Sequence, residues 1–324
     1  MSSKMSGRPG LDSVCRLCHK SVMGNGKRHK TQAIRTLIWM AVWTGLLGAT
    51  VLAADLDEVR GRGVLRHLAV PYARFVTGSG DGLDVELIQL FAEEIGVAYE
   101  WVPTTWKAAF GDLTGQDIRS GQTVTVRGDI LASGLTMLPW REKQVLFSLP
   151  TFASQIWIIA RADYSLAPIL PGKDTLADIR NVQALVKGQQ VIGISQTCLD
   201  PALYGLDRAG ARIRYFDGRL NELVPAVINQ EADLTLQDAP DALVSLEKWP
   251  GQIKVIGPVS TCQRMGAAMD KNAGTLKTAF DLFFEKLWHE GRYQELVDKY
   301  YPGYATYFPD FFLSPEPPEE GAAP

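Results

Sequence analysis

Arg141 is the residue in this sequence whose chemistry best suits an anionic partner. It lies five residues after Thr136, in Thr136-Met-Leu-Pro-Trp-Arg141, and this stretch follows the apolar run 129–132. A guanidinium presents parallel N–H groups that match the two oxygens of a carboxylate. The Thr136 hydroxyl is close enough in sequence to donate to the same anion. An ordinary ion pair between Arg141 and a nearby acid fits the same spacing, and both interpretations stay open.

Asp238 carries the opposite charge at a similar position. It ends the run Asp233-Leu-Thr-Leu-Gln-Asp238, which predicts a buried strand with an acid at its end. An exposed carboxylate there would bind a cationic group. Alternatively, Asp238 would cap the helix predicted to begin at Pro240. Asp233 is interpreted as structural.

Three aromatic residues follow predicted strands and therefore lie near the same strand ends. They are Tyr72, Phe75 and Trp106. Aromatic side chains wall ligand pockets, but they also dominate protein cores. The residue types alone do not separate these two interpretations.

The elements that must position these residues alternate between strand and helix, which predicts an α/β fold. Apolar runs predict strands at 63–70, 99–102, 129–132, 155–160, 191–194, 212–216, 233–238 and 253–256. Helical spacing predicts helices at 84–95, 104–113, 198–210, 220–229, 274–288 and 291–300, with a polar loop at 114–127. In open α/β sheets ligands bind beyond the carboxyl ends of strands, which is where Ser133, Thr136 and Asp238 fall.

The length of 324 residues suggests about two domains. We expect two α/β lobes, each a mostly parallel sheet flanked by helices, with the chain crossing between them near residues 155 and 263. The predicted first lobe comprises 54–155 and 263–313, and the predicted second lobe comprises 156–262. Two crossovers form a hinge, which allows two lobes to close around a small ligand.

Residues 1–53 are predicted to be a secretory signal peptide with an extended basic region. Lys27-Arg-His-Lys30 precedes an uncharged run, and Val51-Leu-Ala53 offers a cleavage site. An uncleaved membrane anchor is the alternative. Cys15-Arg-Leu-Cys18-His19 has the spacing of a haem attachment site, but it precedes the signal segment, so an over-extended start is the better explanation. The Pro/Glu-rich tail 314–324 is predicted to be disordered.

Charge and motif content exclude several functions. Without residues 1–53 the chain keeps 25 of 33 basic and 35 of 36 acidic residues, so the formal net charge falls from −3 to −10. Such an acidic chain does not favour nucleic acid. Zinc-ligand spacings, nucleophile elbows and phosphate loops are absent from the sequence, so we expect no metal and no cofactor. We also expect the protein to be a monomer. Cys198 and Cys262 could pair in an oxidising compartment, and the sequence leaves this open.

Six motifs, in the same order, resemble those of the extracytoplasmic solute-binding proteins of polar amino-acid ABC transporters. They are Tyr72-Ala-Arg-Phe75, Gly82-Leu-Asp-Val-Glu-Leu, Thr136-Met-Leu-Pro-Trp-Arg141, Phe147-Ser-Leu-Pro-Thr-Phe152, Leu236-Gln-Asp238 and Glu290-Gly-Arg-Tyr293. The resemblance spans about Gly63 to Tyr304. It implies a type II periplasmic binding protein fold, a periplasmic location, an amino acid-like ligand and an ABC permease as partner.

The resemblance also implies roles for individual residues. Arg141, helped by Thr136 and by backbone N–H groups near Thr197, would hold the ligand carboxylate. Asp238 would bind the ammonium group, with Ser133 nearby. Tyr72, Phe75 and Trp106 would wall the side-chain pocket. Two departures weaken the match: Leu138 replaces a hydroxyl residue, and Gln196 stands where a glycine is usual.

Two further classes share this resemblance. Exported cyclohexadienyl dehydratases are similar, and their chemistry needs a general acid near the second-lobe loop. Leu199 occupies the place where that comparison expects Glu, and Asp200 is one position further on. The chain also resembles the binding module of membrane-bound lytic transglycosylases, which leaves a sensing or regulatory role open.

Overall fold

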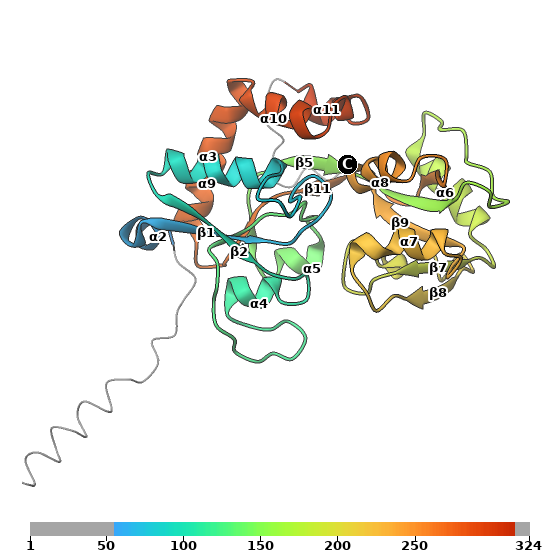
Figure 1. Cartoon of the computed structure of the whole chain (residues 1–324), viewed down its shortest axis with the longest axis horizontal. Coiled ribbons are helices and arrows are strands. Elements are labelled where there is room, and N and C mark those ends of the chain that lie inside the picture. Colours follow the sequence, from blue (N-terminus) through green and yellow to red (C-terminus); the bar gives the residue numbers. More distant parts are fainter. Residues whose placement is uncertain (1–54, 315–324) are drawn as a thin grey trace, which may run out of the picture. The chain divides into compact units, whose positions relative to one another are not determined.

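A computed structural model describes residues 55–314 and places most of their strands in two mixed sheets (Figure 1). The first sheet has the order β2-β1-β3-β12-β4 and the second has the order β10-β6-β9-β7-β8. The strands are β1 (Val64–Ala69), β2 (Ala98–Pro103), β3 (Ile130–Leu131), β4 (Leu146–Phe147), β6 (Ile156–Arg161), β7 (Gln190–Gly193), β8 (Arg212–Tyr215), β9 (Leu234–Asp238), β10 (Ile253–Pro258) and β12 (Ala268–Met269).

The sheets are less parallel than the sequence predicts. In the first sheet β1 runs parallel to β2 and β3, whereas β12 runs antiparallel to β3 and β4. In the second sheet β7 runs parallel to β8 and β9, whereas β6 runs antiparallel to β9 and β10. The antiparallel pairs of both sheets involve β6, β10 or β12, the strands next to the places where the chain changes sheet.

The chain changes sheet twice, as the sequence predicts. It leaves the first sheet through β5 (Phe152–Ser154) and returns through β11 (Gln263–Met265). These two strands pair antiparallel, with Gln263 opposite Ser154 and Met265 opposite Phe152. The paired crossings are where the sequence predicts a hinge between two lobes. The residue limits of the two lobes stay a prediction.

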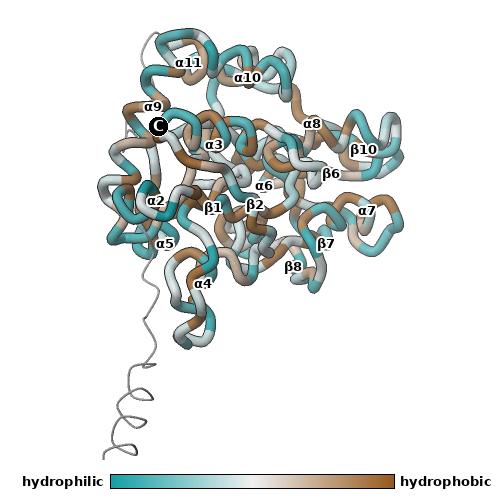
Figure 2. Tube along the Cα trace, turned by 60° about the vertical axis from the view of Figure 1, so that its left-hand side comes forward, coloured by the Kyte–Doolittle hydropathy of each residue, from teal (hydrophilic) through white to brown (hydrophobic). Residues whose placement is uncertain are grey.

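Helices flank the sheets and bury one face each. They are α2 (Leu56–Arg62), α3 (Leu83–Glu94), α4 (Ala109–Thr114), α5 (Pro139–Glu142), α6 (Thr175–Leu185), α7 (Leu223–Ile228), α8 (Ala239–Lys248), α9 (Gly274–His289), α10 (Arg292–Tyr300) and α11 (Pro309–Phe312), with the 3-10 turns η2 (Pro201–Tyr204), η3 (Leu220–Glu222) and η4 (Tyr304–Thr306). In α10 the buried residues are Tyr293, Val297 and Tyr300, and hydrophilic residues fill the other face (Figure 2).

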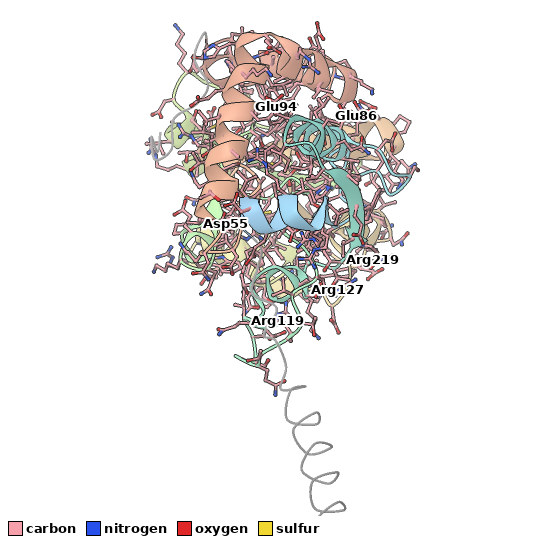
Figure 3. The ribbon with its side chains drawn as sticks, turned by 90° about the vertical axis from the view of Figure 1, so that its left-hand side faces the viewer. Asp55, Glu86, Glu94, Arg119, Arg127 and Arg219 are labelled. Carbon is pink, nitrogen blue, oxygen red and sulfur yellow. The ribbon has the colours of Figure 1, made fainter. Side chains whose placement is uncertain are left out.

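Asp55 ties the first described helix to a helix far along the chain. Its carboxylate Oδ1 accepts hydrogen bonds from the backbone N–H of Leu56, at the start of α2, and from that of Leu276, in the first turn of α9, both at 2.9 Å. Figure 3 shows Asp55 between these two helices. A carboxylate in this position satisfies helix N–H groups that have no partner within their own helix.

Some predicted elements differ from the structure. The predicted helix 198–210 is only the short turn η2, because Gly205 adopts a left-handed conformation (φ 64°) and ends it. The predicted helix 220–229 is divided into η3 and α7. Helices α2 and α6 were not among the predicted elements.

The predicted signal peptide or anchor (1–53) and nearly all of the predicted disordered tail, residues 315–324, lie outside the described residues. Between residues 55 and 314, no helix combines the length and apolar character needed to span a bilayer.

Candidate functional site

A small cavity lies between loops that follow strands of the first sheet and loops that follow strands of the second. The first sheet contributes Tyr72, Trp106, Gly134 and Arg141, and the second contributes Thr197, Cys198 and Leu220. The cavity volume is about 10 Å³, about the space that one water molecule occupies. The two sides of the site are therefore closed on each other in this structure.

Arg141 is a buried cation at this cavity. It sits on α5, whose first residue is Pro139, as the sequence predicts. Its side chain is 3% exposed. Its Nη1 donates to the backbone carbonyl of Thr136 at 2.9 Å, and its guanidinium lies 5.2 Å from the Trp140 ring centre and 5.7 Å from that of Phe110. Burial lowers the pKa of Arg141.

Two buried polar atoms in this corner, Nε of Arg141 and the hydroxyl oxygen of Thr136, have no nitrogen or oxygen partner for a hydrogen bond. The Thr136 hydroxyl interacts with the thiol of Cys198. None of the ion pairs in the described part of the chain involves Arg141. Buried polar atoms are almost always paired, so this corner can accept an anionic group from a ligand.

Asp238 caps a helix, which is one of the two roles predicted for it. It is the N-cap of α8, where its Oδ1 accepts from the backbone N–H of Asp241 at 3.1 Å. Its Oδ2 accepts a hydrogen bond from the Tyr72 hydroxyl, which comes from the other sheet's loops. Burial raises the pKa of Asp238 to about 6, and the hydrogen bonds from Tyr72 and Asp241 oppose that shift.

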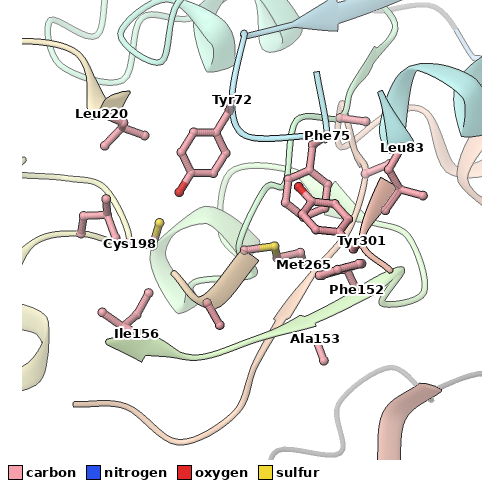
Figure 4. Close-up of a cluster of buried hydrophobic side chains, with 14 of the residues drawn as sticks. Tyr72, Phe75, Leu83, Phe152, Ala153, Ile156, Cys198, Leu220, Met265 and Tyr301 are labelled. Atoms are coloured by element: carbon pink, nitrogen blue, oxygen red, sulfur yellow. The ribbon is translucent and has the colours of Figure 1, made fainter. Parts of the chain in front are cut away.

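Cys198 lies within the electrostatic reach of both charges. The pKa of its thiol is raised to about 11, first by burial and then by the charge of Asp238, while the charge of Arg141 opposes the shift. Figure 4 shows Tyr72 projecting towards Cys198 and Leu220. Cys198 and Cys262 are both free thiols.

The backbone near Thr197 keeps the special conformation that a glycine would usually provide. Gln196 has φ 61°, in the left-handed region. The Thr197 hydroxyl donates to the Ile194 carbonyl at 2.7 Å and accepts from the Leu199 N–H at 3.1 Å. This hydroxyl therefore holds the turn together, while the residue still lines the cavity.

Four of the predicted site residues do not line the cavity: Phe75, Ser133, Thr136 and Asp238. Phe75 is fully buried beside Phe152 and Tyr301, with ring centres 5.0 and 5.2 Å away (Figure 4). The Ser133 hydroxyl donates to the Ala132 carbonyl at 2.6 Å and accepts from the Val70 N–H at 2.9 Å. Phe75 therefore belongs to the hydrophobic core, and the Ser133 hydroxyl connects two loops by hydrogen bonds.

Phe75 nevertheless shapes the cavity through Gly134. Gly134 has φ 61°, and a Cβ atom there would lie 2.5 Å from the Phe75 ring. Its N–H donates to Oδ2 of Asp84 at 2.7 Å. The backbone at Gly134 is thus held between an aromatic ring and a buried carboxylate.

The sequence interpretation did not select three of the lining residues: Gly134, Cys198 and Leu220. Gly134 could have been found, because it directly follows the strand end that carries Ser133. Leu220 gave no signal, since an apolar residue at a helix start is ordinary.

Asp200, the acid considered for an enzymatic role, is used in local structure. Its Oδ1 accepts from the Ala202 N–H at 3.0 Å and from the Tyr215 hydroxyl at 3.1 Å. Leu199 is fully buried. Neither residue is among those that line the cavity.

Comparison with known proteins yields one family match. The model of the bacterial extracellular solute-binding proteins, family 3, matches residues 67–303. A membrane-bound lytic murein transglycosylase F from Desulfosudis oleivorans is 24% identical over 230 residues, which are 70% of this chain and 45% of that protein. A cyclohexadienyl dehydratase from Pseudomonas aeruginosa is 30% identical over 130 residues, 38% of this chain and 42% of that protein. The chain spans less than half the length of these two relatives.

Solved structures share the fold. A mutant of ArgBP from T. maritima superimposes with a TM-score of 0.61 at 22% identity, covering 76% of this chain and 98% of that one. An ancestral amino acid-binding protein, a precursor of cyclohexadienyl dehydratase, gives 0.59 at 25% identity, covering 76% and 100%. An ancestral arginine-binding protein bound to arginine gives 0.60 at 21% identity, covering 74% and 99%.

Proposed function

The chain belongs to the bacterial extracellular solute-binding proteins of family 3, and from this premise we propose that its cavity captures an amino acid or a similar small carboxylate solute. The observation that carries the proposal is the buried Arg141, whose Nε has no hydrogen-bond partner. A ligand carboxylate would accept from Arg141 and from the Thr136 hydroxyl. Each charge-assisted bond contributes about 1.5–3 kcal/mol.

The remaining lining residues would orient the solute. Tyr72 and Trp106 meet edge to face, with ring centres 6.0 Å apart at 85°, and form an aromatic wall. Thr197 would contribute backbone N–H groups to the carboxylate. Asp238 accepts a hydrogen bond from the Tyr72 hydroxyl of this wall, and for an amino-acid solute it would be the partner of the α-ammonium group.

Capture would proceed by closure of the two sheets about the paired crossings β5 and β11. A cavity of about 10 Å³ admits no amino acid, so the solute would enter an open form. Closure excludes water and so strengthens the electrostatic contacts with the solute. The lobes that move would be residues 54–155 with 263–313, and residues 156–262.

We place this capture outside the cytoplasm, with delivery of the solute by the monomeric protein to an ABC permease. The support is the family match and the basic and apolar pattern of residues 1–53. Alternatively, the same binding event would serve ligand sensing instead of transport. The resemblance to the transglycosylase supports this alternative.

An enzyme of the cyclohexadienyl dehydratase kind is the second candidate, favoured by the 30% identity over 130 residues. The engagement of Asp200 in a local turn argues against a general acid at that position. Turnover of that enzyme's substrate by the purified chain would support this candidate over binding alone.

The proposal is tested by a thermal-shift screen of the purified chain against amino acids and small carboxylates. A bound solute at 100 times its dissociation constant should stabilise the native state by about 2.7 kcal/mol. The shift should disappear in Arg141→Met. It should persist in Arg180→Met, which removes a surface arginine with a 66% exposed side chain on α6. A shift that survives Arg141→Met would refute the role of Arg141.

A further inference from the structure

The two charged groups of the site differ in how open they are to the cavity. Arg141 lines it, whereas Asp238 does not, although both residues are buried. Tyr72 lies between the cavity and Asp238: its ring lines the cavity and its hydroxyl donates to Oδ2 of the carboxylate. The cavity therefore presents a cation and neutral side chains.

Both oxygens of Asp238 already accept a hydrogen bond. Oδ1 accepts from the Asp241 N–H and Oδ2 from the Tyr72 hydroxyl. Each carboxylate oxygen could accept a further bond, but Asp238 is fully buried and Tyr72 stands between it and the cavity, so an α-ammonium group would have to take the place of the Tyr72 hydroxyl to reach the carboxylate. It would also leave that hydroxyl buried and in need of a new partner, which is costly.

Arg141, unlike Asp238, lacks hydrogen-bond partners for part of its charged group. Nε of Arg141 is buried without a hydrogen-bond partner, and within residues 55–314 the guanidinium contacts a backbone carbonyl and two aromatic rings but forms no ion pair. The Thr136 hydroxyl has the weakly hydrogen-bonding thiol of Cys198 beside it. A buried cation without a nearby anion is unfavourable. A monoanionic ligand supplies the missing anion, and after the sheets have opened and closed around it the Tyr72 hydroxyl can return to Asp238, because such a ligand has no cation that competes for the carboxylate.

We propose that the site selects small organic carboxylates that lack an α-ammonium group, such as 2-hydroxy acids, over the matching α-amino acids, and that the Tyr72 hydroxyl enforces this choice. This inference rests on the proposed function, because it assumes that the solute carboxylate binds Arg141. A 2-hydroxy group is neutral, so it needs no carboxylate as a partner. It therefore does not compete with the Tyr72 hydroxyl for Asp238 as a charged ammonium group would.

The test compares affinities for the standard amino acids and the corresponding 2-hydroxy acids, measured by calorimetry on the purified chain. For the pair of compounds that contains the tightest ligand, we expect the 2-hydroxy acid to bind 10 or more times more tightly than its amino acid, a free-energy difference of about 1.4 kcal/mol. If in that pair the amino acid binds as tightly as its 2-hydroxy acid, or more tightly, the inference is overturned and the proposed function is left intact. Binding of no member of either series would overturn the proposed function and the inference with it.

The Tyr72→Phe variant tests the mechanism of selection. It keeps the ring that faces Trp106 and removes the hydroxyl that covers Asp238, so the affinity ratio should move at least 10-fold towards the amino acid. Tyr304→Phe is the matched control, since it removes a buried hydroxyl that donates to the Ala153 carbonyl at 3.0 Å and does not line the cavity. If the ratio of the two affinities in Tyr72→Phe equals that of the wild type, the role of Tyr72 is overturned. The selection itself is tested by the ratio in the wild-type protein, which does not depend on the variant.

Discussion

At the scale of single residues, Gly134 shows why the cavity has its shape. It needs a left-handed backbone (φ 61°) and sits against Phe75 with no room for a side chain. We expect Gly134→Ala to destabilise the fold by about 1–2 kcal/mol from the backbone and a further 1–3 kcal/mol, roughly, from overpacking. Urea unfolding measures this change.

Gly121 provides the control for that prediction. It has a similar φ of 68°, but a Cβ atom there would meet nothing within 4 Å. Gly121→Ala should therefore show the backbone cost alone. Equal losses in the two variants would contradict the proposed contact between Gly134 and Phe75.

Asp84, which accepts from the Gly134 N–H, should give the fold a pH dependence. Burial raises the pKa of Asp84 from 3.8 to about 7, and the bond from Gly134 opposes that shift. The native state then holds the proton more tightly than the unfolded state, so the stability due to Asp84 is full below about pH 4 and is lost as the pH rises to about 7.

The Asp84→Asn variant isolates this contribution. Relative to the wild type, it should gain stability as the pH rises from 5 to 8, by on the order of a few kcal/mol. Urea unfolding at each pH measures the difference. Parallel stability curves for the two proteins would show that Asp84 does not titrate in this range.

The residue scale also shows what sequence can and cannot reveal about the site. The spacing of Thr136 and Arg141 predicts their proximity, because five residues around a short turn bring them together, and in the structure Nη1 of Arg141 donates to the Thr136 backbone carbonyl. Of the two interpretations of Asp238, the structure contains the helix cap, and the binding of a cationic group stays a prediction. The placement of Phe75 in the core was not predictable, since its surroundings come from Phe152 and Tyr301, far along the chain.

At the scale of elements, the start of the described chain depends on a shared cap. The Asp55 carboxylate serves the N–H groups of Leu56 and Leu276, so it stabilises α2 and α9 together. We expect Asp55→Ala to cost about 1–2 kcal/mol in urea unfolding.

Asp174 is the matched comparison, because its carboxylate caps α6 by accepting from the Leu176 N–H at 2.9 Å in an exposed position. Asp174→Ala should cost less than Asp55→Ala, at the lower end of the usual range of about 0.5–2 kcal/mol. A larger loss in Asp174→Ala would argue against the link between α2 and α9.

Elements with strong local signals were predicted well, and the others were not. Helix α9 follows from its apolar spacing, and β9 from its apolar run ending in an acid. The predicted helix after Cys198 failed because Pro201 and Gly205 confine it to one 3-10 turn. The mixed sheets were missed because strand direction depends on how the chain returns from one sheet to the other, which periodicity does not encode.

At the scale of the whole described chain, the two sheets meet at a site too small for its solute. The Tyr72 hydroxyl bridges them by donating to Asp238, and the paired crossings β5 and β11 connect them. For a solute to bind, the two sheets must therefore first move apart. Contacts between the sheets are then replaced by contacts with the solute, and the sheets close around it. The ligand would favour the closed form because it contacts residues of both sheets at once.

The most direct test of the account is a crystal structure of the chain with the tightest solute from the binding screen. The account predicts a solute carboxylate oxygen about 2.7–2.9 Å from the Arg141 guanidinium, with Tyr72 and Trp106 beside the solute. A solute bound elsewhere, or bound in this cavity with its carboxylate away from Arg141, would contradict the central claim.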